Sequence, residues 1–138
     1  MADIVDRATR SRMMAGIRGQ DTEPERLVRS HLHKSGLRFR LHSRNLPGRP
    51  DLLFPRYRVA LFVHGCFWHQ HPGCRFAYMP TSNREFWSAK LGGNVIRDAK
   101  KANALEEKGW RVLTIWECET RNPERLARLT REIRGEAE

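Results

Sequence analysis

One short segment of the chain is dense in residues that bind metals or move protons. Five of the eleven residues in segment 64–74, HGCFWHQHPGC, are His or Cys. Thiolates and imidazoles at short spacing suit Zn²⁺, which takes four tetrahedral ligands in structural sites. Within this segment Cys66, His71 and Cys74 supply three ligands, and His69 competes with His71 for the imidazole position.

The chain holds three cysteines, and the third, Cys118, follows an apolar stretch at 110–116. If this stretch pairs beside 57–64, Cys118 reaches the same end of the sheet as Cys66 and completes a four-ligand zinc site. A site closed by four protein ligands is structural rather than catalytic. An odd cysteine count excludes a closed disulfide framework. The alternative interpretation is three unrelated thiols among surface histidines.

Asp51 is a candidate for a different chemistry. It begins a predicted strand after the loop 45–50, although aspartate is disfavoured in strands. A carboxylate on a rigid sheet can hold Mg²⁺ against a phosphate. His64 and His69 lie at the end of the adjacent predicted strand and just beyond it, where a neutral imidazole can take a proton from water. The alternative role for Asp51 is a carboxylate that caps a turn.

Large aromatic side chains lie beside these groups. Phe67 and Trp68 are in the His/Cys segment, and Trp87 is on the helix predicted to follow it. Apolar side chains that enter a base step are used by proteins that bend DNA. The competing interpretation is that these rings pack beneath the zinc loop, because large aromatic residues are mostly buried.

The overall charge indicates a polyanionic partner. The 138 residues include 26 Lys or Arg and 16 Asp or Glu, a formal net charge of +10. Nucleic acid is the first candidate for such a surface. No apolar run approaches the roughly 20 residues that a membrane span needs, and no secretory signal is visible. We therefore expect a cytoplasmic protein that binds DNA and does not bind a membrane.

The periodicity predicts an α/β fold, with a mixed sheet flanked by helices. We expect a basic DNA-binding arm at 1–20 and one domain at 21–138. The predicted helices and strands, in order, are a helix that begins at a Thr22 capping box and ends at Gly36, strands at 37–41, 51–54 and 57–64, a helix from about Ser82 that breaks at Gly92-Gly93, a second helix at 94–108, a buried strand at 110–116, and a helix that begins at Asn122-Pro123.

Several motifs together resemble one known family. Segment 64–74 carries most of the resemblance. The supporting motifs, which occur in the same order as in that family, are RPD (49–51), EFW (85–87), NVIRD (94–98), GWRV (109–112) and WEC (116–118). On these motifs, over roughly residues 6–120, the sequence resembles the very short patch repair DNA mismatch endonuclease family. The resemblance implies a restriction-endonuclease-like fold and a strand-specific nick on the 5′ side of the thymine in T·G mismatches, which arise when 5-methylcytosine deaminates. It also implies one or two catalytic Mg²⁺ ions, one structural Zn²⁺, and a duplex DNA partner.

The resemblance also implies roles for individual residues. Asp51 corresponds to the metal-binding carboxylate, the backbone carbonyl of Val63 to a second metal ligand, and His69 to the general base. The residues that would support the catalytic site are His64, Glu25 and Asp98. The zinc ligands would be Cys66, His71, Cys74 and Cys118. The residues that would contact DNA are Phe67, Trp68, Trp87, Met14 and Lys90. The wider nuclease superfamily has an Asp/Glu-x-Lys motif on the second strand. In this chain Val63-His64-Gly65 stands in its place.

Two other functions remain open at this point. One is a zinc-containing module that binds DNA without cutting it. The other is a nuclease of the same fold that acts on another target, in restriction or on another lesion. Asp51 together with His64 and His69 favours catalysis, because a module that only binds DNA does not need them. The arm and the aromatic wedge suggest a monomer on an asymmetric site, and mismatch-repair proteins are further candidate partners.

Overall fold

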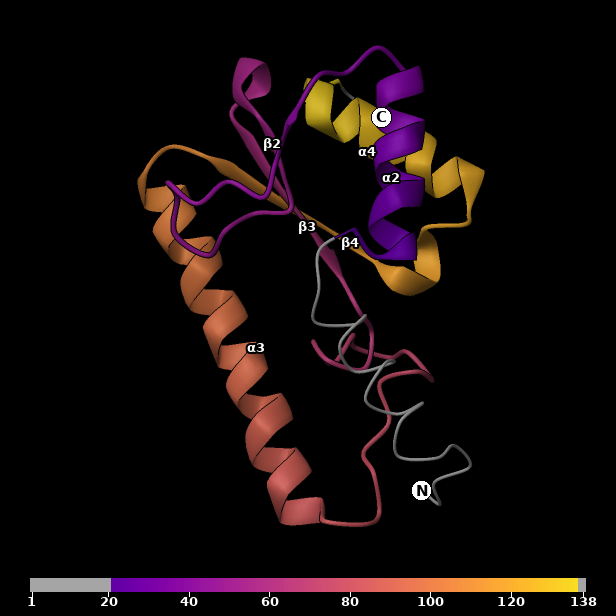
Figure 1. Ribbon diagram of the computed structural model, residues 1–138, viewed down its shortest axis with the longest axis vertical. Helices are drawn as coiled ribbons and strands as arrows, with labels where there is room; N and C mark the ends of the chain where they lie inside the picture. Colours follow the sequence, from indigo (N-terminus) through magenta and orange to yellow (C-terminus); the bar gives the residue numbers. More distant parts are fainter. Residues whose placement is uncertain (1–20, 137–138) are drawn as a thin grey trace.

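The computed structural model describes residues 21–136, so the predicted arm 1–20, with Met14, lies outside the described residues. The described chain contains a four-stranded sheet and three long helices (Figure 1). None of these helices is both long and apolar enough to cross a bilayer. In chain order the elements are α2 (Glu23–Lys34), β1 (Arg40–Leu41), β2 (Leu52–Phe54), the 3₁₀ turn η1 (Pro55–Tyr57), β3 (Val59–His64), α3 (Arg84–Glu107), β4 (Arg111–Trp116), the 3₁₀ turn η2 (Glu117–Glu119) and α4 (Pro123–Arg134).

The sheet is mixed, with strand order β1-β2-β3-β4. β2 pairs antiparallel with β1 and with β3, whereas β3 and β4 are parallel. In the parallel pair His64 is level with Trp116, so the segments that follow the two strands start at the same edge of the sheet. The predicted mixed sheet, and the predicted pairing of 110–116 with 57–64, are both confirmed.

Helices lie on both faces of the sheet (Figure 1). α2 and α4 pack together on one face, where the largest buried cluster has formed. On the other face Leu105 of α3 packs against a smaller buried cluster. The N-terminal half of α3 continues past the end of β3, alongside the loop of residues 65–83 (Figure 1). The main core consists of Val28, Leu32, Leu37, Leu52, Phe54, Val59, Leu61, Ile115, Leu126, Leu129 and Ile133.

Local sequence signals explain where the two packed helices begin. The Thr22 side chain accepts a hydrogen bond from the Glu25 backbone N–H at 3.4 Å, as predicted for a capping residue. Asn122 Oδ1 caps α4 in the same way, accepting from the backbone N–H groups of Glu124 and Arg125. The Glu25 carboxylate, however, does not return to Thr22; it accepts from the Asp21 N–H instead.

The prediction of two helices separated at Gly92-Gly93 is wrong. α3 is continuous from Arg84 to Glu107. An internal glycine costs a helix only about 1 kcal/mol relative to alanine, and strong helix formers lie on both sides of the pair. Helix formation over 24 residues therefore outweighs the two glycines.

Two strands also differ from their predicted form. The strand predicted at 37–41 is reduced to Arg40–Leu41, because Leu37 closes the end of α2 through a backbone bond to Leu32. β4 was predicted to be buried, yet only Ile115 in it is fully buried. The reason is its position at the edge of the sheet, where it has one neighbouring strand among residues 21–136.

Candidate active site and metal centre

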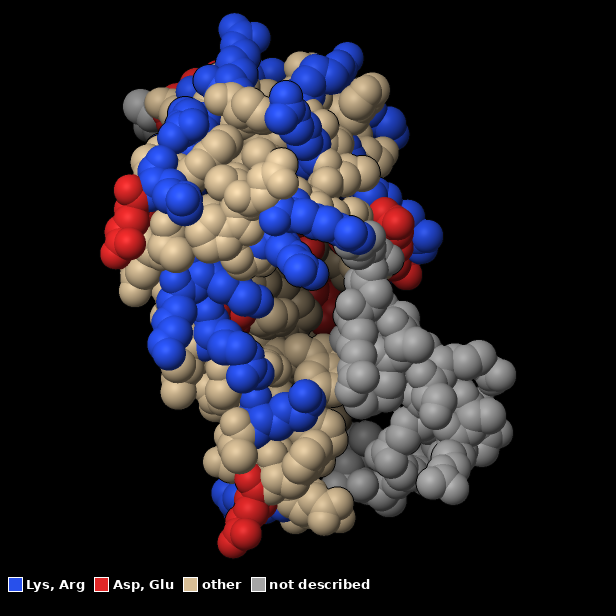
Figure 2. All heavy atoms as spheres, turned by 60° about the vertical axis from the view of Figure 1, so that its left-hand side comes forward, with Lys and Arg blue, Asp and Glu red and all other residues tan. Residues whose placement is uncertain are grey.

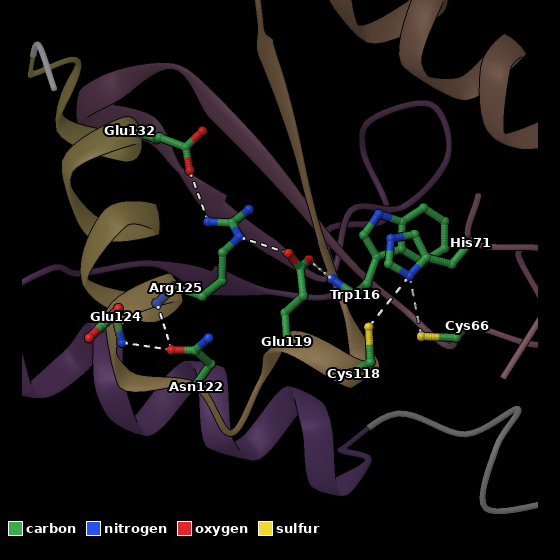
Figure 3. Close-up of polar contacts among 9 residues, drawn as sticks. All are labelled: Cys66, His71, Trp116, Cys118, Glu119, Asn122, Glu124, Arg125 and Glu132. Atoms are coloured by element: carbon green, nitrogen blue, oxygen red, sulfur yellow. Dashed lines mark hydrogen bonds and ion pairs between the residues drawn. The ribbon is translucent and has the colours of Figure 1, made fainter. Parts of the chain in front are cut away.

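Four metal-ligating side chains meet just beyond the paired ends of β3 and β4. The ligand atoms of Cys66, His71, Cys74 and Cys118 all lie within 4.8 Å of one another. His71 Nδ1 is 3.7 Å from Cys66 Sγ and 3.5 Å from Cys118 Sγ (Figure 3). All three cysteines are free. The structure thus brings the four predicted residues together, and it separates the competing His69 from them.

The chemistry and spacing of this cluster fit a zinc ion. A tetrahedral site with Zn–S of about 2.3 Å and Zn–N of about 2.0 Å has an N-to-S edge of about 3.5 Å. The two measured separations from His71 Nδ1 are 3.5 and 3.7 Å. Burial raises the pKa of the Cys66 thiol to about 12, so this thiol keeps its proton unless a cation takes its place.

Tight backbone turns position the ligands within the loop. The His71 N–H donates to the Cys66 carbonyl at 3.0 Å, and the Cys74 N–H donates to the His71 carbonyl at 3.2 Å. The His71 ring stacks on Trp116 of β4, with ring centroids 4.3 Å apart and planes 9° apart. These contacts fix the imidazole relative to the turn after β4, which carries Cys118.

A second group of side chains lies between β3 and α3. His69 and Asp98 form an imidazole–carboxylate pair, with Nδ1 2.6 Å from Oδ2. His64, the last residue of β3, stacks flat on His69, with ring centroids 3.8 Å apart and planes 6° apart. When His69 donates its Nδ1–H to Asp98, its Nε2 is the nitrogen that can accept a proton. This arrangement is what a general base requires.

His64 is suited to remain uncharged beside this pair. His64 is only 9% exposed. Burial, followed by the nearby His69, lowers the pKa of His64 to about 4. Its buried Nδ1 has no hydrogen-bond partner among the described residues. A neutral His64 can therefore pack against His69 without repelling a proton there.

Asp51 lies beside the end of β3, directly before β2. Its Oδ2 accepts a hydrogen bond from the Val63 backbone N–H at 2.7 Å. Its Oδ1 makes no hydrogen bond within residues 21–136. Burial raises the pKa of Asp51 to about 6, and the charge of nearby Glu25 adds to the rise. A half-buried carboxylate whose Oδ1 is uncommitted among the described residues, with an acidic neighbour, fits a site for a divalent cation.

One residue at this site was missed by the sequence analysis. His42 Nε2 is 2.5 Å from Glu25 Oε1, and the His42 backbone N–H donates to the Asp51 carbonyl at 3.0 Å. His42 thus connects a buried glutamate of α2 to the segment that carries Asp51. In the sequence it looks like one more polar residue of an alternating strand. Its φ of 47° turns the chain there, and no local sequence signal predicts that turn.

The three predicted wedge residues form one aromatic cluster beside the His/Cys loop. The ring centroids of Phe67 and Trp68 are 5.2 Å apart, and those of Trp68 and Trp87 are 5.9 Å apart. Asn94 of α3 donates to the Trp68 carbonyl at 2.9 Å, which ties the loop to the helix. All three rings are half-exposed, so they pack on one another and still offer surface to a ligand. Lys90, also half-buried, follows on the same helix.

The surroundings of the second group are hollow and basic. A cavity of about 290 Å³ lies between α3 and the sheet, next to His69 and Asp98. Figure 2 shows Lys and Arg side chains gathered on one face of the molecule, along the side of a hollow. With a net charge of +10, such a surface favours a phosphate-rich ligand.

This fold and this site define a DNA endonuclease of the restriction-endonuclease-like class. The sequence profile of the family described as DNA mismatch endonuclease Vsr matches residues 2–75. The chain belongs to this family, and the resemblance seen in its motifs is confirmed.

Relatives with related names cover most of the chain. The protein named DNA mismatch endonuclease Vsr from Escherichia coli is 47% identical, over 91% of this chain and 80% of the relative. Type II nicking enzyme V.XorIIP from Xanthomonas oryzae is 49% identical, over 86% of this chain and 87% of the relative. Type II nicking enzyme V.NmeAIP from Neisseria meningitidis is 41% identical, over 97% and 98%.

Proposed function

We propose that this endonuclease makes a strand-specific nick on the 5′ side of the thymine in a T·G mismatch, with Mg²⁺ as its cofactor. The observation that carries the hydrolytic role is the 2.6 Å contact between His69 Nδ1 and Asp98 Oδ2. The His69 ring stacks on His64, the last residue of β3, and is close enough to Asp51 to act on its charge. The name of the Escherichia coli relative, DNA mismatch endonuclease Vsr, supports mismatched DNA as the substrate. Those of the two nicking enzymes support cleavage of one strand.

Asp51 is the residue that would hold Mg²⁺, together with the backbone carbonyl of Val63. Glu25, held by His42 near Asp51, would orient water at the same site. Bound Mg²⁺, as one or two ions, would polarise the scissile phosphate and stabilise the leaving oxygen.

The chain's own residues supply the proton transfer. Asp98 accepts the Nδ1–H of His69, which fixes the ring and leaves Nε2 to take a proton from the attacking water. His64 stays neutral and keeps the His69 ring in place by stacking. Attack of this water on the phosphorus, with the 3′ oxygen as the leaving group, leaves a 5′-phosphate and a 3′-hydroxyl. A positioned general base contributes about 10²–10⁴-fold to the rate.

Recognition of the mismatch would depend on the aromatic cluster. A T·G pair stacks less well than a Watson–Crick pair, so opening the stack there costs less. Phe67, Trp68 and Trp87 would enter the opened step, and Lys90 would contact DNA nearby. Met14 would act from the arm, outside the described residues. The Cys66, His71, Cys74 and Cys118 cluster would hold a structural Zn²⁺ that shapes the loop bearing two of the rings.

We further propose that the enzyme acts as a monomer in the bacterial cytoplasm, with mismatch-repair proteins as additional partners. The second candidate function is a nuclease of this fold with another target, because several relatives are named type II nicking enzymes. A module that binds DNA without cutting it is disfavoured, since it has no use for the His69–Asp98 pair.

The test is a nicking assay on duplexes that differ at one base pair. Each strand is labelled separately, the central pair is T·G, A·T or G·C, the flanking sequence is varied, and Mg²⁺ or EDTA is present. We expect Mg²⁺-dependent cutting only at T·G and only on the thymine strand.

Asp51→Ala is the matched inactive variant for this assay. Cutting of T·G duplexes that persists in Asp51→Ala would contradict the proposed metal site. Cutting of matched duplexes by the wild type would instead support the second candidate function. Tight binding without cutting under every flank would support the non-catalytic module.

A further inference from the structure

The turn that carries Cys118 is clamped to the last helix by a network of charged side chains (Figure 3). Glu119 Oε1 accepts a hydrogen bond from the Trp116 backbone N–H at 2.9 Å. Its Oε2 accepts from Arg125 Nε at 3.0 Å. Arg125 Nη1 also donates to Glu132 Oε1 at 3.0 Å. One carboxylate thus holds both the start of η2 and the side of α4.

Arg125 differs from an ordinary surface arginine in its burial. Its side chain is 12% exposed, against 26% for Glu119 and 35% for Glu132. Solvent-exposed ion pairs contribute little, whereas removing one partner from a largely buried pair leaves an uncompensated charge. The proposed catalysis and DNA binding give this network no role.

The network lies next to a metal ligand. Cys118 sits between Glu117 and Glu119 in the three-residue turn η2. Glu117 Oε1 accepts from the Cys66 backbone N–H at 3.4 Å, so the acid before Cys118 contacts a second ligand segment. The acid after Cys118 contacts Trp116 and Arg125. Cys118 itself is exposed, so its position depends on its two neighbours in the turn.

The charges around the metal centre also indicate a role for Arg125. Three thiolates and one neutral imidazole around Zn²⁺ carry a net charge of 1−, so a further carboxylate nearby is unfavourable. Glu119, the residue directly after Cys118 in the turn, is such a carboxylate. Arg125 offsets the Glu119 charge while it fixes the carboxylate in place.

We propose that Glu119 and Arg125 are positioning residues of the metal centre, which hold the Cys118 turn in its ligating arrangement and thereby slow the loss of Zn²⁺. The inference rests on the proposal that the Cys/His cluster binds zinc. Residues that orient metal ligands typically contribute 10–100-fold to metal affinity.

The experiment measures how fast zinc-loaded protein transfers Zn²⁺ to an excess of a chromogenic chelator. We expect Arg125→Ala to release zinc about 10–100-fold faster than the wild type. Arg125→Lys should be intermediate, since it keeps the charge and loses the planar fork. Arg131→Ala, at an exposed arginine of the same helix, is the matched control and should match the wild type.

A second readout separates positioning from general stabilisation. Co²⁺ is loaded in place of zinc, and its tetrahedral and thiolate charge-transfer bands are recorded. We expect these bands to weaken in Arg125→Ala and in the milder Glu119→Gln, which keeps the side-chain shape if Arg125→Ala fails to fold. Wild-type release rates and spectra in Glu119→Gln, or a lowered melting temperature with unchanged bands, would overturn the inference.

The two proposals fail in different ways. If the wild type binds no zinc, the structural zinc site is wrong, and this inference is wrong with it. If the wild type binds one zinc and the variants release it at the wild-type rate, only the role of Glu119 and Arg125 is wrong.

Discussion

At the scale of single residues, the charge of Asp51, which the proposed nicking activity requires, is expected to lower the stability of the fold. Burial raises its pKa from 3.8 to about 6. Protonated Asp51 therefore favours the folded state below about pH 4, and this contribution is lost as the pH rises through 6. Asp51→Asn removes the charge and keeps an oxygen for the Val63 N–H. We expect the free energy of unfolding, measured by urea titration at pH 8, to rise by about 3 kcal/mol. The gain should nearly vanish at pH 4, and nicking should be lost.

Asp98 provides the control of opposite sign. Burial alone would raise the pKa of Asp98, but the hydrogen bond from His69 and the nearby positive charges together outweigh it, so the pKa is lowered. The stability that Asp98 contributes is therefore present at neutral pH and lost as the pH falls through its lowered pKa. Asp98→Asn should destabilise the fold at pH 8. A decrease in stability for both variants at pH 8 would contradict the environment described for Asp51.

At the scale of elements, the glycines of α3 give a test of helix energetics. A Cβ added at Gly92 would meet no heavy atom within 4 Å. We expect Gly92→Ala to raise the free energy of unfolding by about 0.5–1 kcal/mol, because alanine is the better helix former. Gly48→Ala should do the reverse. Gly48 has a φ of +75°, and an added Cβ there would lie 2.7 Å from Lys101 Cβ. Thermal or urea unfolding measures both, and a destabilised Gly92→Ala would contradict the helix packing described.

Elements with strong local signals were predictable from the sequence. The Thr22 and Asn122 caps, and the apolar run of β3, each specify an element without help from the rest of the chain. The continuity of α3 was not predictable from Gly92-Gly93 alone, because the length of the helix decides it. The His42 side chain contacts Glu25 because of one left-handed backbone residue, a feature that periodicity does not reveal.

The candidate site shows the same division between local and distant information. The meeting of Cys66, His71, Cys74 and Cys118 could be predicted from residue types and strand pairing, since β3 and β4 end together. The pairing of His69 with Asp98 joins residues 29 positions apart, on a loop and a helix. The family resemblance, and no spacing rule, assigned Asp98 to the catalytic site as a support for metal-bound water; its pairing with His69 is seen in the structure alone.

At the scale of the whole molecule, charge determines how the protein meets DNA. The net charge is +10, and basic side chains gather on one face (Figure 2). If about six phosphates are neutralised, the logarithm of the affinity should fall with the logarithm of the salt concentration at a slope of about −5. This slope is measured by fluorescence anisotropy with a labelled duplex, at salt concentrations from about 50 to about 200 mM. A slope near about −1 would mean that few phosphates are contacted, contrary to the proposed interface.

The central claim is that His69, held by Asp98, takes the proton from the attacking water. The most direct measurement is the single-turnover rate of nicking of a T·G duplex by His69→Ala, with His33→Ala, an exposed histidine of α2, as the matched control. We predict a rate about 10²–10⁴-fold below the wild type, with unchanged affinity for the duplex and full activity in the control. A His69→Ala rate equal to that of the wild type would contradict the account.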